Sequence, residues 1–208
     1  MAGITWKQIR ELESIKLYAG DLLNHLGYPD FIGLSITKID DKHILQDATK
    51  PIPLKDNTVD IFVSEDVFEH IQYNKLPSII SEIYRILKPG GLFRWATPDY
   101  GCDILQNRTE KDGKGQLIFD PVGGGSLAAP GHTWFPRIES VKQLLSKSIF
   151  YTDGKIEYLH YYEMDGSPIM REIDHSIAPI KRTPDFDDRV KDPRRPMSLV
   201  VDLFKKEK

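Results

Sequence analysis

The stretch that decides the fold is VDIFVSEDVFEH, at residues 59–70. Its first half is rich in β-branched and aromatic residues and predicts a buried strand over 59–64. Polar residues follow abruptly, and in open parallel sheets ligands bind outside the carboxyl ends of the strands. We therefore expect these polar side chains to face a crevice. A purely structural reading fits the same spacing, with Glu65 and Asp66 capping the next helix and His70 on the surface.

The sequence on both sides of this stretch alternates between short apolar runs and helical patterns. Further strands are predicted over residues 15–19, 31–36, 43–46, 92–96, 155–163 and 197–204, and helices over 76–87 and 138–146. Lys88-Pro89-Gly90-Gly91 should end the first of these helices, because proline cannot continue it and glycine supplies positive φ. The pattern predicts one α/β domain over residues 1–208, doubly wound, with a mostly parallel sheet and a final antiparallel strand. Only Asp21 to Asp30 separates the first two strands, so the first helix must be short.

Two segments depart from this alternation. Residues 98–136 lose apolar periodicity and are rich in Gly and Asp, which predicts a lid or insertion, since connections of that length usually serve function or lack order. Residues 171–196 are charged and contain prolines, which predicts a surface arm or a homodimer contact. The glycine run at 123–125 is not a phosphate loop, because no strand precedes it and no Lys-Ser/Thr pair follows.

Composition excludes several classes of protein. The 28 basic and 31 acidic residues give a net charge of −3, which argues against a nucleic-acid partner that would need a basic face. The single cysteine, Cys102, rules out an intrachain disulfide and a cysteine-based zinc cluster, and it fits a reduced, cytoplasmic setting. We expect no metal site from the sequence. No apolar run is long enough to cross a membrane, so no membrane partner is expected.

Four motifs follow one another in a fixed order: DATKPIPLKDNTVD at 47–60, SEDVFEH at 64–70, LKPGG at 87–91 and TPD at 97–99. This series resembles the type 11 family of class I S-adenosylmethionine-dependent methyltransferases. The opening KLYAG at 16–20 and the segment 180–202 resemble a short subgroup associated with glycan synthesis. The resemblance implies a Rossmann-like fold, S-adenosyl-L-methionine as cofactor, and methyl transfer to a small-molecule or glycan-linked acceptor.

The resemblance also implies a set of cofactor-binding residues: Tyr18, Ala19, Gly20, Ser35, Asp47, Ala48, Ser64 and Glu65. Gly20 matches the first glycine of the loop beside the methionine part of the cofactor, but the next expected glycine falls at Leu22. Ser35 stands where an acidic residue usually accepts hydrogen bonds from the ribose, and it offers only a weaker, uncharged acceptor. Asp47 matches the residue that contacts the adenine amine. Ser64 and Glu65 match the strand exit beneath the methyl-donor sulfur.

The candidate catalytic residues are His70, His132 and Asp99. Orientation of the acceptor against the sulfonium supplies most of the rate in such a transfer, and a general base helps when the acceptor is a hydroxyl. His132 lies in Gly-His-Thr-Trp after the glycine-rich segment, where a lid histidine and an ordinary surface histidine are both consistent with the pattern. Because two of four cofactor positions are altered, the alternative function is a non-catalytic scaffold or binding protein on the same fold.

Overall fold

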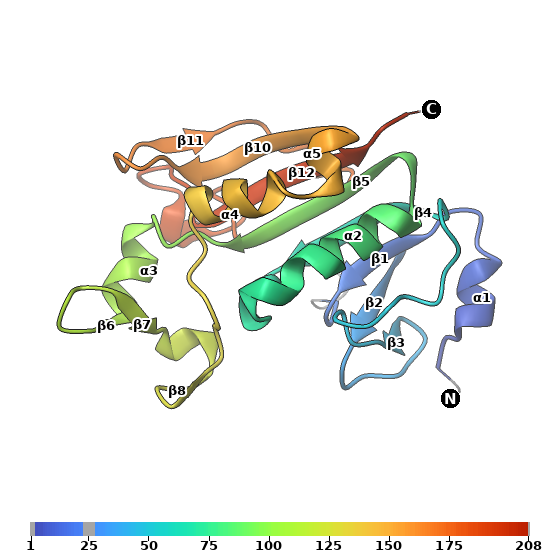
Figure 1. Cartoon of the computed structure of the whole chain (residues 1–208), viewed down its shortest axis with the longest axis horizontal. Coiled ribbons are helices and arrows are strands. Elements are labelled where there is room, and N and C mark those ends of the chain that lie inside the picture. The colour runs from blue at the N-terminus through green and yellow to red at the C-terminus, as the bar shows by residue number, and fades with distance from the viewer. Residues whose placement is uncertain (1–2, 23–27, 208) are drawn as a thin grey trace.

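The computed structural model describes residues 3–22 and 28–207. Their core is an eight-stranded sheet of order β11-β10-β12-β5-β4-β1-β2-β3 (Figure 1). β1 (Lys16–Ala19), β2 (Phe31–Ser35), β3 (His43–Leu45), β4 (Val59–Glu65) and β5 (Leu87–Pro98) are parallel to one another. β12 (Ser198–Lys205) runs antiparallel to both β5 and β10 (Gly154–Tyr162), and β11 (Pro168–Met170) adds a short antiparallel edge. The predicted α/β class, with its mostly parallel, Rossmann-like sheet and final antiparallel strand, is confirmed.

Helices cover one face of the sheet. α1 (Trp6–Arg10), α2 (Leu76–Ile86), α4 (Ile138–Leu145) and α5 (Ile149–Thr152) contribute buried apolar residues to one cluster with β1, β4, β5 and β12 (Figure 1). α2 owes this position to its apolar stripe, in which Ile79, Ile80 and Ile83 are buried. The short first helix that the sequence predicts between β1 and β2 falls largely on residues 23–27, which lie outside the described residues.

The opposite face has a different cover. A second apolar cluster joins sheet residues such as Val63 and Val200 to Leu22, Tyr28 and the segment 173–180. Among the described residues, the arm 171–196 therefore lies where a helix is expected, and the prediction of a solvated surface arm is wrong for its apolar positions. Charged residues dominate the composition of the arm and obscure the three side chains that pack in the cluster on this face of the sheet: Ile173, Ala178 and Ile180. A homodimer contact by this arm stays a prediction.

A buried ion pair fastens the arm to the sheet. Arg94 on β5 is only 2% exposed and forms a two-pronged contact with Asp202 on β12, at 2.8 and 2.7 Å. Its remaining nitrogen donates to the backbone carbonyls of Asp174, at 2.8 Å, and Ala178. One side chain thus joins two neighbouring strands to the segment that covers them.

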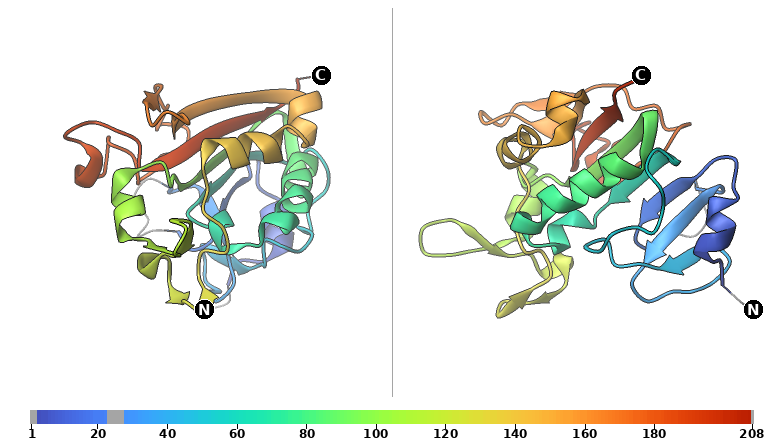
Figure 2. Two further views of the ribbon diagram at one scale, coloured as in Figure 1. Left: turned by 60° about the vertical axis from the view of Figure 1, so that its left-hand side comes forward. Right: turned by 45° about the vertical axis from the view of Figure 1, so that its right-hand side comes forward.

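The long connection after β5 contains α3 (Asp103–Arg108) and two small hairpins, β6 (Glu110–Lys111) with β7 (Leu117–Phe119) and β8 (Gly125–Ser126) with β9 (Ala129–Pro130). Figure 2 shows these hairpins projecting from the body of the molecule. Tyr100, Cys102 and Leu105 anchor the start of the segment in a third apolar cluster. The connection is thus a folded insertion with exposed tips, and its action as a lid stays a prediction.

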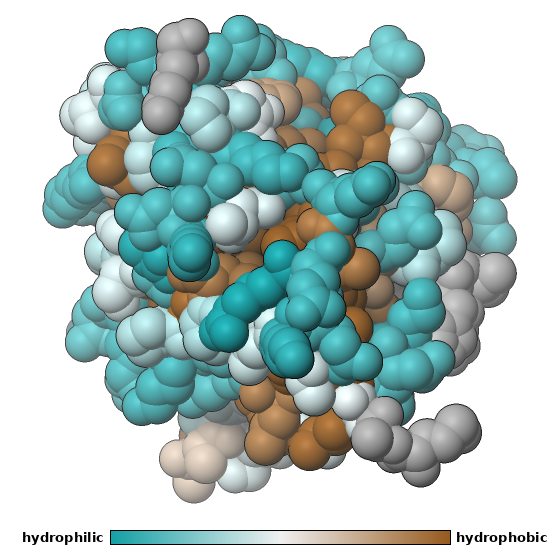
Figure 3. Space-filling model, turned by 90° about the vertical axis from the view of Figure 1, so that its right-hand side faces the viewer, coloured by the Kyte–Doolittle hydropathy of each residue, from teal (hydrophilic) through white to brown (hydrophobic). Residues whose placement is uncertain are grey.

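β3 is the edge strand at the end of the sheet opposite β11, and α1 lies near that end (Figure 1). Figure 3 shows this side of the molecule, where apolar surface lies between hydrophilic side chains. Within the described residues, none of the helices combines the length and apolar character needed to cross a bilayer.

Candidate active site

A pocket of about 570 Å³ opens at the carboxyl ends of β1, β2, β3 and β4. Its lining consists of residues that follow these strands directly or lie at their ends: Gly20, Asp21, Leu34, Ile36, Thr37, Gln46, Asp47, Ala48, Asp66, Val67, His70 and Ile71. Four parallel strands that end at one edge bring these distant residues together, which is the usual position of a ligand in an open α/β sheet. The crevice that residues 59–70 predict is therefore present.

Gly20 forms the wall of the pocket after β1. Its φ is +101°, and a Cβ there would lie 3.3 Å from Val67 Cγ2. Glycine alone adopts this backbone without strain. Leu22, at the position of the missing second glycine, is buried in the cluster beneath the arm, and its N–H donates to His43 Nε2 at 3.0 Å. Its side chain does not line the pocket. Tyr18 and Ala19 are also buried and do not line it, so of the residues predicted from β1 only Gly20 reaches the pocket.

The end of β2 differs from the prediction. Ser35 is buried, and its hydroxyl oxygen accepts the N–H groups of Thr37, at 3.0 Å, and Lys38, at 2.8 Å. This oxygen therefore caps its own turn and does not line the pocket. Asp21, which does line it, forms an ion pair with Lys38 at 2.9 Å. Hydrogen bonds from Ser35 and Lys38 hold the pKa of Asp21 below its usual range, so an ionised carboxylate lies at the pocket.

Asp47 and Ala48 line the pocket after β3, as the motif predicts. Asp47 is exposed, and its Oδ1 accepts the N–H of Thr49 at 2.8 Å. This backbone hydrogen bond lowers the pKa of Asp47. Gln46, which the sequence interpretation overlooked, also lines the pocket and donates through its amide to the carbonyl of Asp47 at 2.9 Å.

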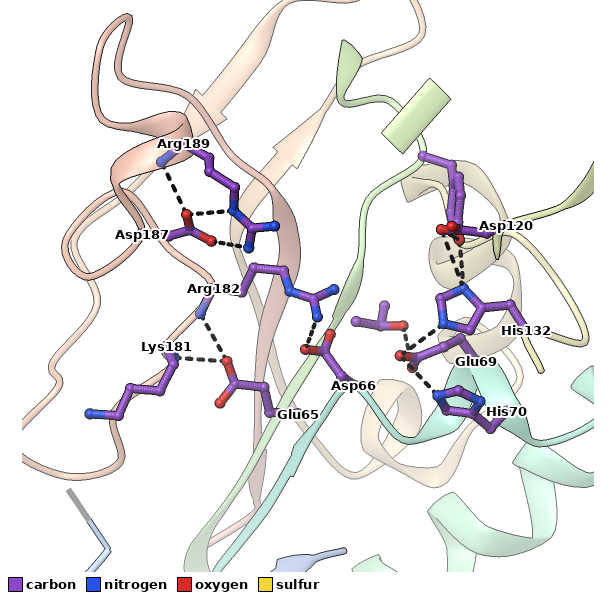
Figure 4. Close-up of polar contacts among 12 residues, drawn as sticks. Glu65, Asp66, Glu69, His70, Asp120, His132, Lys181, Arg182, Asp187 and Arg189 are labelled. Atoms are coloured by element: carbon purple, nitrogen blue, oxygen red, sulfur yellow. Dashed lines mark hydrogen bonds and ion pairs between the residues drawn. The ribbon is translucent and has the colours of Figure 1, made fainter. Parts of the chain in front are cut away.

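After β4, the residue that reaches the pocket lies one position later in the sequence than predicted. Ser64 is fully buried, and Glu65 turns toward the arm, where its Oε1 accepts the N–H groups of Lys181, at 2.7 Å, and Arg182, at 3.0 Å (Figure 4). Neither residue lines the pocket. Asp66 does, with a left-handed φ of +55° and an ion pair to Arg182 at 2.7 Å. The left-handed residue changes the direction of the chain and brings Asp66 to the pocket instead.

Glu65 should make stability depend on pH. Burial, reinforced by the neighbouring Asp66, raises the pKa of Glu65 from 4.5 to about 7. A carboxyl whose pKa is raised on folding stabilises the fold fully below its unfolded pKa, and this contribution is lost as the pH rises through the folded value. We expect the free energy of unfolding to fall between pH 5 and pH 8, and to fall less in Glu65→Gln, which keeps the acceptor oxygen. Urea unfolding of both proteins at several pH values measures this, and equal pH dependence in both would contradict it.

The two candidate histidines lie side by side, and one of them reaches the pocket. His70 lines it, and its ring centroid is 4.8 Å from that of His132. His132 is only 6% exposed, so the surface-loop reading is wrong. Its Nδ1 lies 2.5 Å from the Tyr100 hydroxyl, which also contacts Asp120 at 2.7 Å. Burial lowers the pKa of His132 to about 4, so its imidazole is neutral near pH 7. Whether either histidine acts as a base stays a prediction.

Asp99 lies apart from them. Its two oxygens accept the N–H groups of Gly101, at 2.8 Å, and Tyr162, at 2.9 Å, and so tie the end of β5 to β10. Burial raises the pKa of Asp99 to about 6. It lines a separate pocket of about 150 Å³ with Arg137 and Glu139. The structure therefore does not group Asp99 with the histidines, as the sequence interpretation did, because a structural contact uses both of its oxygens.

Glu69 is the buried carboxylate that the candidate set omitted. It lies in a short 3-10 helix, Phe68–His70, that follows β4. One oxygen accepts the hydroxyl of Thr97 at 3.0 Å, and the other, Oε1, lies 3.9 Å from Nε2 of both His70 and His132 (Figure 4). Burial, followed by the charge of Asp66, raises the pKa of Glu69 to about 8. The sequence signal that could have identified Glu69 was its position next to His70 in the stretch at residues 59–70.

Comparison with known proteins agrees with this geometry. Residues 28–94, which run from just before β2 into β5, match the family model described as a methyltransferase domain. The matched segment contains β2, β3, β4 and most of β5. The match covers about a third of the chain and ends before the insertion and the arm. It does not distinguish the glycan-associated subgroup. No curated protein matches the sequence significantly.

Solved structures share the whole fold at low sequence identity. A methyltransferase from Archaeoglobus fulgidus that depends on S-adenosylmethionine is 14% identical, with a TM-score of 0.54 over 96% of this chain and 90% of that one. Phosphoethanolamine N-methyltransferase 2 of Haemonchus contortus, solved with S-adenosyl-L-methionine, is 12% identical, with a TM-score of 0.51 over 100% of this chain and 54% of that one. These similarities establish the fold.

Proposed function

We propose that this protein transfers the methyl group of S-adenosylmethionine to a small-molecule or glycan-linked acceptor. The observation that carries the proposal is the pocket at the ends of β1 to β4, which joins Gly20 to Asp47. The methyltransferase-domain match spans β2, β3 and β4, which supply most of this lining. Three of the residues that the resemblance assigns to the cofactor, Gly20, Asp47 and Ala48, therefore lie at one cavity, although the strands that they follow are separated in sequence.

Each end of the cofactor has a candidate partner. At Gly20 the absence of a side chain leaves room for the methionine part, and Asp47 presents an exposed carboxylate to the adenine amine. Asp21 takes the role that Ser35 cannot fill, because its ionised carboxylate can accept both ribose hydroxyls. With this assignment, cofactor binding would not depend on the two positions at which the chain departs from the family pattern.

The acceptor is expected beside Asp66, His70 and His132, on the side of the pocket nearest the insertion. A neutral imidazole there can accept the proton of an acceptor hydroxyl. The phosphoethanolamine methyltransferase from Haemonchus contortus is named for a small acceptor, in keeping with this class of substrate. We further propose that the insertion at 98–136, whose hairpin tips are exposed, closes over the acceptor.

The alternative is a scaffold or binding protein that has lost the cofactor. Leu22 and Ser35 favour it, since both depart from the family pattern and neither lines the pocket. Cofactor binding distinguishes the two functions.

Titration with S-adenosylhomocysteine by calorimetry tests the proposal. We expect binding by the unaltered protein, and binding about tenfold weaker or more in Asp47→Ala and in Asp21→Asn, because each loses a charged hydrogen-bond partner. The matched control is Asp112→Ala. Asp112 also caps a turn through Oδ1 but lies away from the pocket, so this variant should bind normally. No heat and no thermal shift at millimolar ligand would reject the enzyme and favour the scaffold.

A further inference from the structure

The group formed by Glu69, His70 and His132 has donor atoms that all lie within 4.8 Å of one another. We propose that these three residues bind a divalent transition-metal ion at the edge of the cofactor pocket. Two imidazole nitrogens and one carboxylate oxygen suit manganese, iron, cobalt or zinc better than magnesium or calcium, which prefer oxygen ligands throughout. The sequence interpretation expected no metal, because it considered only cysteine clusters and missed Glu69.

Hydrogen bonds at Nδ1 leave the Nε2 atom of each imidazole with the lone pair that coordination of a metal ion requires. His70 Nδ1 lies 3.0 Å from the carbonyl of Gly131, so Nδ1 carries the proton and Nε2 keeps its lone pair. Tyr100 donates its hydroxyl proton to Asp120 at 2.7 Å, so its oxygen must accept from His132 Nδ1. The Nε2 atom of His132 therefore also keeps a lone pair. Both lone pairs face the same carboxylate.

One oxygen of the Glu69 carboxylate lacks a hydrogen-bond partner within the described part of the chain. Glu69 is fully buried, and its Oε1 has no hydrogen bond among the described residues. An unsatisfied buried acceptor costs about 1–3 kcal/mol, so native structures rarely retain one. This atom lies 3.9 Å from Nε2 of each histidine (Figure 4), too far for a hydrogen bond. The two imidazole lone pairs and this carboxylate oxygen therefore converge on one point, an arrangement that suits a bound cation.

The distances permit coordination after a small adjustment. Ligands at about 2.0–2.2 Å from a metal ion lie roughly 3–3.5 Å from each other. Each imidazole Nε2, now 3.9 Å from Glu69 Oε1, must therefore approach it by about 0.5–1 Å, and donor atoms as far apart as 4.8 Å must approach by about 1–2 Å. The side chain of His70 is 44% exposed, which leaves room for a small shift of the ring. The supporting contacts are already in place, since Thr97 holds the second oxygen of Glu69 and Arg108 holds Asp120 at 2.7 Å. Such outer contacts commonly orient metal ligands.

The position of this site suggests its role. His70 belongs both to the ligand set and to the pocket lining, so open coordination positions would face the acceptor. A bound cation lowers the pKa of a coordinated hydroxyl. With both imidazole lone pairs on the metal ion, the hydroxyl would release its proton to solvent and not to a histidine. Its oxygen would form a bond to the methyl carbon as the carbon–sulfur bond breaks to leave S-adenosylhomocysteine. This role rests on the proposed methyl transfer, whereas binding of the metal does not.

The test is calorimetric titration of chelator-treated protein with Mn²⁺, Co²⁺ and Zn²⁺, with electron paramagnetic resonance of the bound Mn²⁺. We expect one ion per chain. His70→Ala and Glu69→Gln should each weaken binding more than about a hundredfold, and Tyr100→Phe, which removes an outer contact, about 10–100-fold. The control is His175→Ala. His175 pairs with Asp185 at 3.2 Å but lies outside the three-residue group, so this variant should bind as the unaltered protein does.

Failure of this proposal is distinguishable from failure of the proposed function. No binding of any of the three ions at millimolar concentration, or undiminished binding in His70→Ala, would overturn the metal site. The same proteins are titrated with S-adenosylhomocysteine: binding of that ligand without metal leaves the methyltransferase proposal intact, and binding of metal without that ligand leaves the metal site intact. His70 is half-exposed, so His70→Ala keeps the test decisive even where Glu69→Gln does not fold.

Discussion

Replacing Asp202 with alanine should destabilise the fold by about 3–5 kcal/mol, the cost of leaving one member of a buried ion pair without its partner. Arg94 is 2% exposed, and its guanidinium cannot reach water when the carboxylate is removed. The same guanidinium holds the arm through the carbonyls of Asp174 and Ala178, so the arm should loosen together with the β5–β12 pairing. The effect is large because the unpaired charge of Arg94 disturbs both the pairing of β5 with β12 and the packing of the arm against the sheet.

Urea unfolding measures this effect, and Asp30→Ala is the control. Asp30 lies 3.9 Å from Lys16, but its side chain is 75% exposed. Exposed pairs contribute between zero and about 1 kcal/mol, so this variant should unfold almost as the unaltered protein does. A loss below about 1 kcal/mol in Asp202→Ala would show that Arg94 finds other partners and that the arm does not depend on this contact.

Replacing Gly20 with valine should reduce affinity for S-adenosylhomocysteine more than about a hundredfold, which corresponds to about 3 kcal/mol. The substitution places a branched side chain at the pocket wall and forces valine into a backbone region that it rarely adopts, at a cost of about 1–3 kcal/mol. Calorimetry measures the affinity, and thermal unfolding shows whether the fold is retained.

Gly115→Val separates the two effects. Gly115 also has a positive φ, at +79°, but a Cβ there would meet no atom within 4 Å. The backbone strain should therefore be similar, while S-adenosylhomocysteine binds normally. Unchanged affinity in a folded Gly20→Val protein would show that the ligand does not use this pocket.

Much of the fold could be predicted because its signals are local. The apolar run at 59–64 forms β4, and the stripe at 76–87 forms α2, since each burial pattern follows from the periodicity of one element. The pocket could be anticipated because parallel strands end at the same edge. Gly20, Asp47, Ala48 and His70 all line it, each at or shortly after a strand end that the motif order marks.

The remaining site residues depend on information that periodicity does not contain. The left-handed φ of Asp66 decides that this residue, and not Glu65, reaches the pocket, and a non-glycine residue gives little warning of such a turn. The partners of Glu65 lie on the arm, more than a hundred residues away in sequence. His132 is buried among Tyr100, His70 and Gly123, which come from separate segments of the chain. These are tertiary contacts, which no single element reveals.

The place of β12 in the sheet affects the order in which the chain can fold during synthesis. β12 (Ser198–Lys205) fills the gap between β5 and β10, although both of those strands leave the ribosome earlier. Until β12 emerges, the hydrogen-bonding edge of β5 stays open, and an open edge of this length invites pairing with other chains. A nascent chain that stalls before Ser198 should therefore be a substrate for chaperones, and the sheet should close only after translation has passed residue 205.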